Sequence, residues 1–221
     1  MTTIPWPDVD WRAMREESLA WRAKRRARSG AGTLFLLDGA SCSGKSTLVD
    51  RLTNGEGAVD LVPRYSTRER RQDDQRRREY IFVSPDAFRR RAEAGAFIEY
   101  RDFQFGMSYG LPWADAFTPL LAGRQGLAVI NLGNVRHVKA LLPEAVTILV
   151  DASLATIRQR LVTRGVNTPE QIDERLTNAA RVESYRPYYD YVVINEDGTL
   201  KQAQDFLHAL VVSRTPHSKT P

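Results

Sequence analysis

The chain has 221 residues, of which 42% are hydrophobic and 27% charged, and this composition is typical of one globular domain with a small appendage. Its only cysteine, Cys42, excludes an internal disulfide and a zinc site built from several thiolates. No apolar run approaches the roughly 20 residues of a membrane span, and the first residues lack the apolar core of a signal peptide. We therefore expect a cytoplasmic protein with no membrane span.

The net charge of +5 is carried mainly by arginine. Arginine presents a planar fork that matches pairs of phosphate oxygens, so its abundance indicates anionic ligands. For any arginine outside a motif, the alternative explanation is a solvated basic surface that reflects GC-rich codon usage.

Residues 1–30 differ from the rest of the chain, because tryptophans lie there among many arginines before the sequence Ser-Gly-Ala-Gly at 29–32. The pattern predicts a basic amphipathic helix from about 10 to 28, which forms an N-terminal extension. Such a helix can contact nucleic acid, an anionic membrane or a partner subunit. We favour packing of its tryptophans on the main domain or across a homodimer, and we expect no nucleic-acid partner.

Residues 39–46 form a complete G-x-x-x-x-G-K-[ST] phosphate-binding loop between an apolar run at 33–37 and a segment of helical spacing at 47–52. Its glycines allow the tight turn that presents backbone N–H groups to a polyphosphate. Lys45 then reaches the β- and γ-phosphates, and the Ser46 hydroxyl binds Mg²⁺. The residues expected to hold ATP are Gly39, Ala40, Ser41, Cys42, Ser43, Gly44, Lys45, Ser46 and Thr47.

Strand-like and helix-like segments alternate after this loop. Strand composition occurs at 58–62, 79–83, 97–100, 127–132, 146–150 and 191–194, and helical periodicity at 85–94, 114–122, 154–163, 169–182 and 200–211. The alternation predicts an α/β fold of the P-loop NTPase type, in which a parallel sheet is flanked by helices in three layers. The main domain is expected at 31–214, with an inserted acceptor lobe at about 63–111 and a flexible tail at 215–221.

Further segments stand in the order in which they occur in the guanylate kinase family. Residues 65–71 and 79–83 resemble the signature S-x-T-T-R-x-P-R ending in D-Y-x-F, and residues 95–100 resemble G-x-F-[IL]-E-[WY]. Residues 160–165 repeat the family's R-L-x-x-R-G, and residues 189–197 resemble its closing D-Y-V-V-V-N-D-D. Each piece alone is a weak signal, but their common order indicates guanylate kinase similarity.

The resemblance covers about residues 33–211 and implies a kinase that transfers a phosphoryl group from ATP, with Mg²⁺ and a helical lid at about 160–175. Phosphoryl transfer needs positioning and charge neutralisation more than a covalent catalyst. The catalytic residues that the resemblance implies are Lys45, Arg160, Arg164 and Arg175, and Asn195 takes the family position beside the adenine.

The resemblance also implies where the acceptor binds. Arg68, Arg71 and Tyr80 occupy family positions that hold the acceptor's phosphate, and two guanidinium forks with a phenol hydroxyl suit that group. Glu99 occupies the position that accepts hydrogen bonds from the edge of the base. Tyr109 and Asn131 complete the implied substrate site.

Several positions depart from the guanylate kinase pattern. Arg64 stands where the family has serine, Leu111 stands where it has serine or threonine, and Asn131 and Gly133 replace an acidic pair. Because selectivity for a base depends on such hydrogen-bonding groups, we expect altered acceptor specificity. The expected acceptor is a small phosphorylated metabolite, either a nucleoside monophosphate or a sugar phosphate.

Residues 106–112 and 129–131 also resemble ribose 1,5-bisphosphate phosphokinase, which makes phosphoribosyl diphosphate. That activity is one alternative, GMP kinase proper is a second, and a non-catalytic guanylate-kinase-like binding module is a third. The intact Lys45, Ser46 and lid arginines argue against the binding module, which has no chemical need for them.

Overall fold

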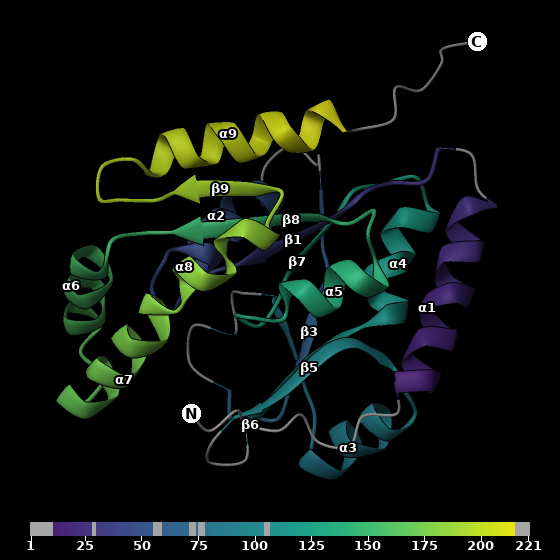
Figure 1. Ribbon diagram of the computed structural model, residues 1–221, viewed down its shortest axis with the longest axis horizontal. Helices are drawn as coiled ribbons and strands as arrows, with labels where there is room; N and C mark the ends of the chain where they lie inside the picture. The colour runs from purple at the N-terminus through teal and green to yellow at the C-terminus, as the bar shows by residue number, and fades with distance from the viewer. Residues whose placement is uncertain are drawn as a thin grey trace.

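The computed structural model describes residues 11–27, 30–54, 59–70, 74, 78–103 and 107–214. At its centre lies a parallel sheet in the strand order β2-β7-β1-β8-β9 (Figure 1). The strands are β1 Leu34–Asp38, β2 Asp60–Leu61, β7 Gly126–Val129, β8 Val146–Asp151 and β9 Tyr191–Ile194. β1 is buried along its whole length, which explains its apolar sequence, since strands of a parallel sheet are covered on both faces.

Alternate side chains of β1 belong to two apolar layers, one on each face of the sheet. Phe35 and Leu37 pack with residues of α2 (Lys45–Thr53) and α9 (Leu200–Ser213). Leu34 and Leu36 pack in the other layer, whose helices are α4 Trp113–Leu121, α5 Val135–Leu141, α6 Leu154–Arg164, α7 Pro169–Ala180 and α8 Val182–Tyr185. The expected three-layer arrangement is therefore confirmed. A single 3-10 turn, Arg186–Tyr188, follows α8.

A second, smaller sheet in the order β4-β3-β6-β5 lies beside the main one. Its strands are β3 Arg64–Ser66, β4 Tyr80–Phe82, β5 Phe97–Phe103 and β6 Met107–Pro112. The helix α3, Pro85–Glu93, lies between β4 and β5 in the chain. Phe88, Phe97 and Tyr100 form its own apolar cluster, with the Phe88 and Phe97 rings stacked at 4.7 Å. These elements occupy the segment in which the sequence indicated an inserted lobe.

The N-terminal helix α1 (Trp11–Arg26) packs against α4 at the side of the domain (Figure 1). The Trp21 ring lies 5.5 Å from that of Phe117, and the Ser18 hydroxyl donates to the carbonyl of Leu141 at 2.8 Å. The favoured packing of a tryptophan on the main domain thus holds for Trp21, whereas Trp6 lies outside the described residues. Within the described part of the chain, no helix is long and apolar enough to cross a membrane.

Four elements differ from the sequence expectation. The segment that forms β3, Arg64–Ser66, has only three residues, and β6, Met107–Pro112, contains glycine and proline, so neither composition indicates a strand. The strand expected at 127–132 ends at Val129, because the chain then turns through Gly133, which has a φ of 89°. This turn leads into the unanticipated helix α5 and carries two asparagine side chains toward β5.

Candidate active site

The phosphate-binding loop connects the carboxyl end of β1 to α2. Gly39 has a φ of 147°, and a Cβ there would lie 2.2 Å from the carbonyl oxygen of Val150. Gly44 has a φ of 97°, and a Cβ there would lie 2.0 Å from the Asn195 side-chain nitrogen. Both positions therefore require glycine, because of their backbone conformation and because other chain segments pack directly on the loop.

Lys45 folds its side chain back over the loop. Its ammonium group donates to the carbonyl oxygens of Gly39 at 2.6 Å and Ala40 at 2.7 Å. Burial lowers the pKa of Lys45 to about 8, against the opposing effect of the Asp38 carboxylate. A cation is thus held at the centre of the loop, where a polyphosphate would lie.

Asp38, the last residue of β1, fixes the start of the loop. One oxygen of its carboxylate accepts from the backbone N–H of Gly39 at 2.6 Å, and the other accepts from the Tyr189 hydroxyl. The side chain has no exposed surface, and burial raises the pKa of Asp38 to about 6. Sequence reasoning did not single out this pair, which spans 151 positions of the chain.

A cavity of about 850 Å³ opens beside the loop. Residues around the main sheet and residues around the small sheet both line it. Ser46 and Glu79 face each other in it, with the hydroxyl oxygen 3.4 Å from a carboxylate oxygen. Sequence reasoning missed Glu79, although this residue directly precedes Tyr80 in the family signature. The cavity is lined by Ser41, Cys42, Gly44, Lys45, Ser46, Thr47, Arg68, Asp74, Glu79, Tyr80, Gln159, Arg160, Thr163, Arg164, Asn195, Glu196, Asp197, Gly198 and Leu200.

Arg68 and Tyr80, which we expect to bind the acceptor, line one side of this cavity. Arg68 makes a two-pronged ion pair with Asp74, and its guanidinium carbon lies 4.9 Å and 5.0 Å from the ring centres of Tyr80 and Phe82. Tyr109 continues this aromatic wall, since its ring lies 5.9 Å from that of Tyr80. The other expected phosphate ligand, Arg71, lies outside the described residues.

Glu99, on β5 of the small sheet, and Asn131, just after β7 of the main sheet, are buried and do not line the cavity. The Glu99 carboxylate is fully buried and accepts hydrogen bonds from the side-chain amides of Asn131, at 2.8 Å, and Asn134. Its second oxygen lies 3.5 Å from a guanidinium nitrogen of Arg64. Glu99 and Asn131, which we expect to bind the substrate, are therefore hydrogen-bonded to each other. Their other partners also belong to this protein.

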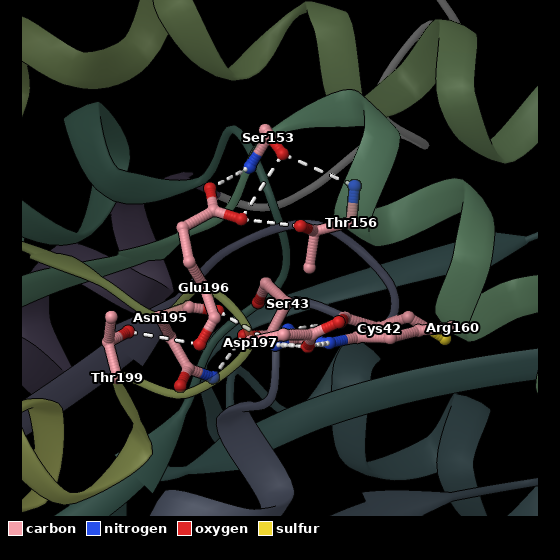
Figure 2. A network of polar contacts seen from close by, with 9 residues as sticks. All are labelled: Cys42, Ser43, Ser153, Thr156, Arg160, Asn195, Glu196, Asp197 and Thr199. Carbon is pink, nitrogen blue, oxygen red and sulfur yellow. Dashed lines mark hydrogen bonds and ion pairs between the residues drawn. The ribbon is translucent and has the colours of Figure 1, made fainter.

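The first lid arginine, Arg160, lies against the loop that follows β9 (Figure 2). Its guanidinium donates to the Asp197 carboxylate at 2.7 and 3.0 Å, to the carbonyl of Asn195 at 2.9 Å and to that of Cys42 at 3.3 Å. Arg160 therefore connects the phosphate-binding loop to the post-β9 loop. Glu196 anchors the same loop to the start of α6 through Ser153 and Thr156 (Figure 2).

The other lid arginines occupy different positions. Arg164, near the end of α6, is exposed and lines the cavity. Arg175, on α7, donates to the Ser41 hydroxyl at 2.9 Å and so reaches the phosphate-binding loop directly. Asn195 donates to the Ser43 carbonyl at 2.7 Å, while its own side-chain oxygen is buried without a hydrogen-bond partner. The hydrogen bond to Ser43 places Asn195 against the phosphate-binding loop, and its position beside an adenine stays a prediction.

Residues 31–210 match the family model described as guanylate kinase. The chain belongs to the guanylate kinase family. A guanylate kinase from Dechloromonas aromatica (strain RCB) is 36% identical over 182 residues, which are 82% of this chain and 89% of the relative. One from Corynebacterium diphtheriae is 32% identical over 185 residues, 83% of this chain and 96% of the relative.

A solved guanylate kinase from Anaplasma phagocytophilum superposes with a TM-score of 0.63 over 86% of this chain and 89% of that one, at 21% identity, and so confirms the fold. As a member of the guanylate kinase family, the chain is an ATP-dependent kinase with a phosphorylated acceptor. These relatives do not bear on the partial resemblance to ribose 1,5-bisphosphate phosphokinase.

Proposed function

We propose that this guanylate kinase family member phosphorylates a nucleoside monophosphate, with GMP as the acceptor and Mg²⁺·ATP as the donor. The curated relatives favour GMP kinase over the altered acceptor that the sequence led us to expect. The observation that carries the proposal is the presence of Lys45 and Arg68 in one cavity. Their two cationic groups suit the phosphates of the donor and the acceptor.

On the donor side, the loop amides and Lys45 would hold the ATP phosphates. The chemistry of Ser46 and Glu79 fits Mg²⁺, because a hydroxyl and a carboxylate are hard oxygen ligands and Mg²⁺ retains waters and substrate phosphates as its other ligands. Asn195, which lines the same cavity, would lie beside the adenine. When bound, Mg²⁺ would neutralise charge on the transferred group.

On the acceptor side, Arg68 would exchange the carboxylate of Asp74 for the phosphate of the monophosphate. A guanidinium binds either group through two parallel hydrogen bonds, so the exchange conserves geometry. The Tyr80 hydroxyl would donate to the same phosphate, and Tyr109 would form the wall of the site. Arg71 remains a proposed ligand whose placement the structure does not describe.

For the transfer step, we assign charge neutralisation to Lys45, Arg164 and Arg175. Phosphoryl transfer spreads negative charge over the oxygens of the moving group, and fixed cations lower its free energy. Arg160 is assigned to holding the post-β9 loop beside the donor, because three of its hydrogen bonds go to that loop and a fourth goes to the phosphate-binding loop. The lobe at 63–111 and the lid at 160–175 would close on the acceptor and the donor, respectively.

A coupled assay of ADP release tests this proposal. With ATP and Mg²⁺ present, we expect turnover with GMP that exceeds turnover with AMP, CMP or ribose 1,5-bisphosphate. Turnover with ribose 1,5-bisphosphate alone would replace the proposal with the sugar-phosphate alternative. Absence of turnover with every acceptor, together with tight binding of a phosphopeptide and none of ATP, would instead support a binding module.

A further inference from the structure

Arg64 opens β3 and is buried, with 5% of its surface exposed. One of its guanidinium nitrogens donates to the Asn131 side-chain oxygen at 2.6 Å and lies 3.5 Å from Glu99. The ring of Tyr109 lies 5.5 Å from its guanidinium carbon. Arg64 therefore sits between the aromatic wall of the acceptor site and the fully buried carboxylate behind it.

The hydrogen bonds of Glu99 are divided between two sets of donors. Asn131 and Asn134 both donate to Oε2, while Oε1 faces Arg64. A carboxylate pairs most favourably with two parallel N–H donors, one for each of its oxygens. The guanidinium of arginine presents such a donor pair, and so does the N1–H and 2-amino edge of guanine. Because Asn131 and Asn134 already donate to Oε2, Arg64 and a guanine base would compete for Oε1 of Glu99.

The pairing of Arg64 is incomplete. Its Nε atom is buried and has no hydrogen-bond partner, and its contact with Glu99 is long at 3.5 Å. A buried donor without a partner is costly, so a ligand that presents a hydrogen-bond acceptor to Nε gains free energy on binding. A ligand that presents only hydrogen-bond donors to Arg64 and Glu99 gains no binding free energy from Arg64. Such a ligand must also displace Arg64 from Glu99.

We propose that Arg64 is a specificity-determining residue, which holds Glu99 away from guanine and makes the acceptor site tolerant of bases that present a carbonyl in place of the guanine amino group. This inference rests on the proposed function, since it concerns the acceptor of the same kinase reaction. Xanthosine monophosphate is the matched probe, because its base has a 2-carbonyl and an N3–H where guanine has a 2-amino group and an unprotonated N3. A site built to pair with the amino group rejects such an analogue by about 10⁴-fold or more.

The first measurement is the ratio of kcat/KM for GMP to that for xanthosine monophosphate in the unmodified protein. We expect a ratio below about 10². A ratio above about 10⁴ would overturn the proposal, because Glu99 would then be reading guanine without hindrance from Arg64. This measurement requires no variant and so cannot be confused with a folding defect.

The second measurement uses Arg64→Ser and Arg64→Lys. We expect Arg64→Ser to raise the ratio by about 10-fold or more, and Arg64→Lys, which keeps the charge without the fork, to raise it less. The KM for ATP should stay within about twofold in both. An unchanged ratio in a folded Arg64→Ser protein would contradict the proposal, whereas a merely structural role would alter stability and leave the ratio unmoved.

Calorimetric binding of GMP and xanthosine monophosphate without ATP separates this inference from the proposed function. If no monophosphate is turned over but both bind with similar affinity, and Arg64→Ser favours GMP, the role of Arg64 stands while the kinase assignment falls. If neither monophosphate binds the unmodified protein, the inference falls as well.

Discussion

Arg68 and Asp74 form a two-pronged ion pair, with nitrogen–oxygen distances of 2.6 and 2.7 Å, inside the cavity that also contains Lys45. Both side chains are almost fully buried, at 7% and 6% exposure. The carboxylate of Asp74 raises the pKa of Arg68 through this hydrogen bonding. The Asp74 carboxylate is thus paired with the guanidinium that we assign to the acceptor's phosphate. The acceptor must displace this carboxylate in order to bind.

Asp74→Asn should lower the KM for the acceptor by about 3- to 10-fold, because a neutral amide competes less well for the guanidinium fork than a carboxylate does. The same change should lower the free energy of unfolding by about 3 kcal/mol, since it removes one partner of a buried ion pair. Steady-state kinetics and denaturant unfolding measure the two effects. Asp86→Asn, at an exposed position of the same lobe, is the control and should alter neither. A raised KM for the acceptor would show that Asp74 positions Arg68 instead of competing for it.

The two arginines of α6 should have separable effects. Arg160→Ala should raise the KM for ATP by about 10-fold, because Arg160 holds the post-β9 loop through Asp197 and Asn195. Arg164→Ala should mainly lower kcat, by about 10²-fold or more, because Arg164 is assigned to the transferred group.

Arg158 lies on α6 with both arginines and forms an exposed ion pair with Asp173 of α7, so Arg158→Ala provides the matched control for both variants. Initial rates over a matrix of ATP and acceptor concentrations distinguish the two parameters. The assignment would be wrong if Arg160→Ala lowered kcat as much as Arg164→Ala does and left the KM for ATP unchanged.

The buried Asp38 should make stability depend on pH. Its folded-state pKa of about 6 lies above the ordinary value of 3.8, so between these values the folded protein keeps a proton that the unfolded chain releases. The contribution of Asp38 to the free energy of unfolding is therefore greatest at low pH and declines as the pH rises through about 6. Relative to Asp38→Asn, whose side chain does not titrate, the unmodified protein should lose about 1 kcal/mol of stability from pH 5 to pH 7.5. Urea unfolding of both proteins at the two pH values measures this difference, and a constant difference would refute the assignment.

The donor half of the site was predictable because its residues are contiguous. The tight turns at Gly39 and Gly44, and the placement of Lys45 and Ser46 at the start of a helix, follow from one eight-residue motif. The parallel sheet was predictable for a similar reason, since buried strands such as β1 carry unbroken apolar runs.

The acceptor half was predictable only in part. The contacts of Glu99 involve residues up to 35 positions away, and they depend on the turn at Gly133, which composition alone did not place. Asp74 lies in a strongly charged segment in which no local pattern indicates the acidic group that reaches Arg68. The sequence did identify Arg64 as a departure from the family, but the structure was needed to find its partners.

The central claim is that Lys45 and Arg68 face the donor and the acceptor of one phosphoryl transfer. Its most direct test is the transfer of radiolabel from [γ-³²P]ATP to GMP, with the product separated and identified. We predict labelled GDP from the unmodified protein, a loss of about 10²- to 10³-fold in rate for Lys45→Met, and no loss for Lys201→Met at an exposed position. Unlabelled GMP after complete incubation with a folded, ATP-binding protein, or equal labelling by Lys45→Met, would contradict the claim.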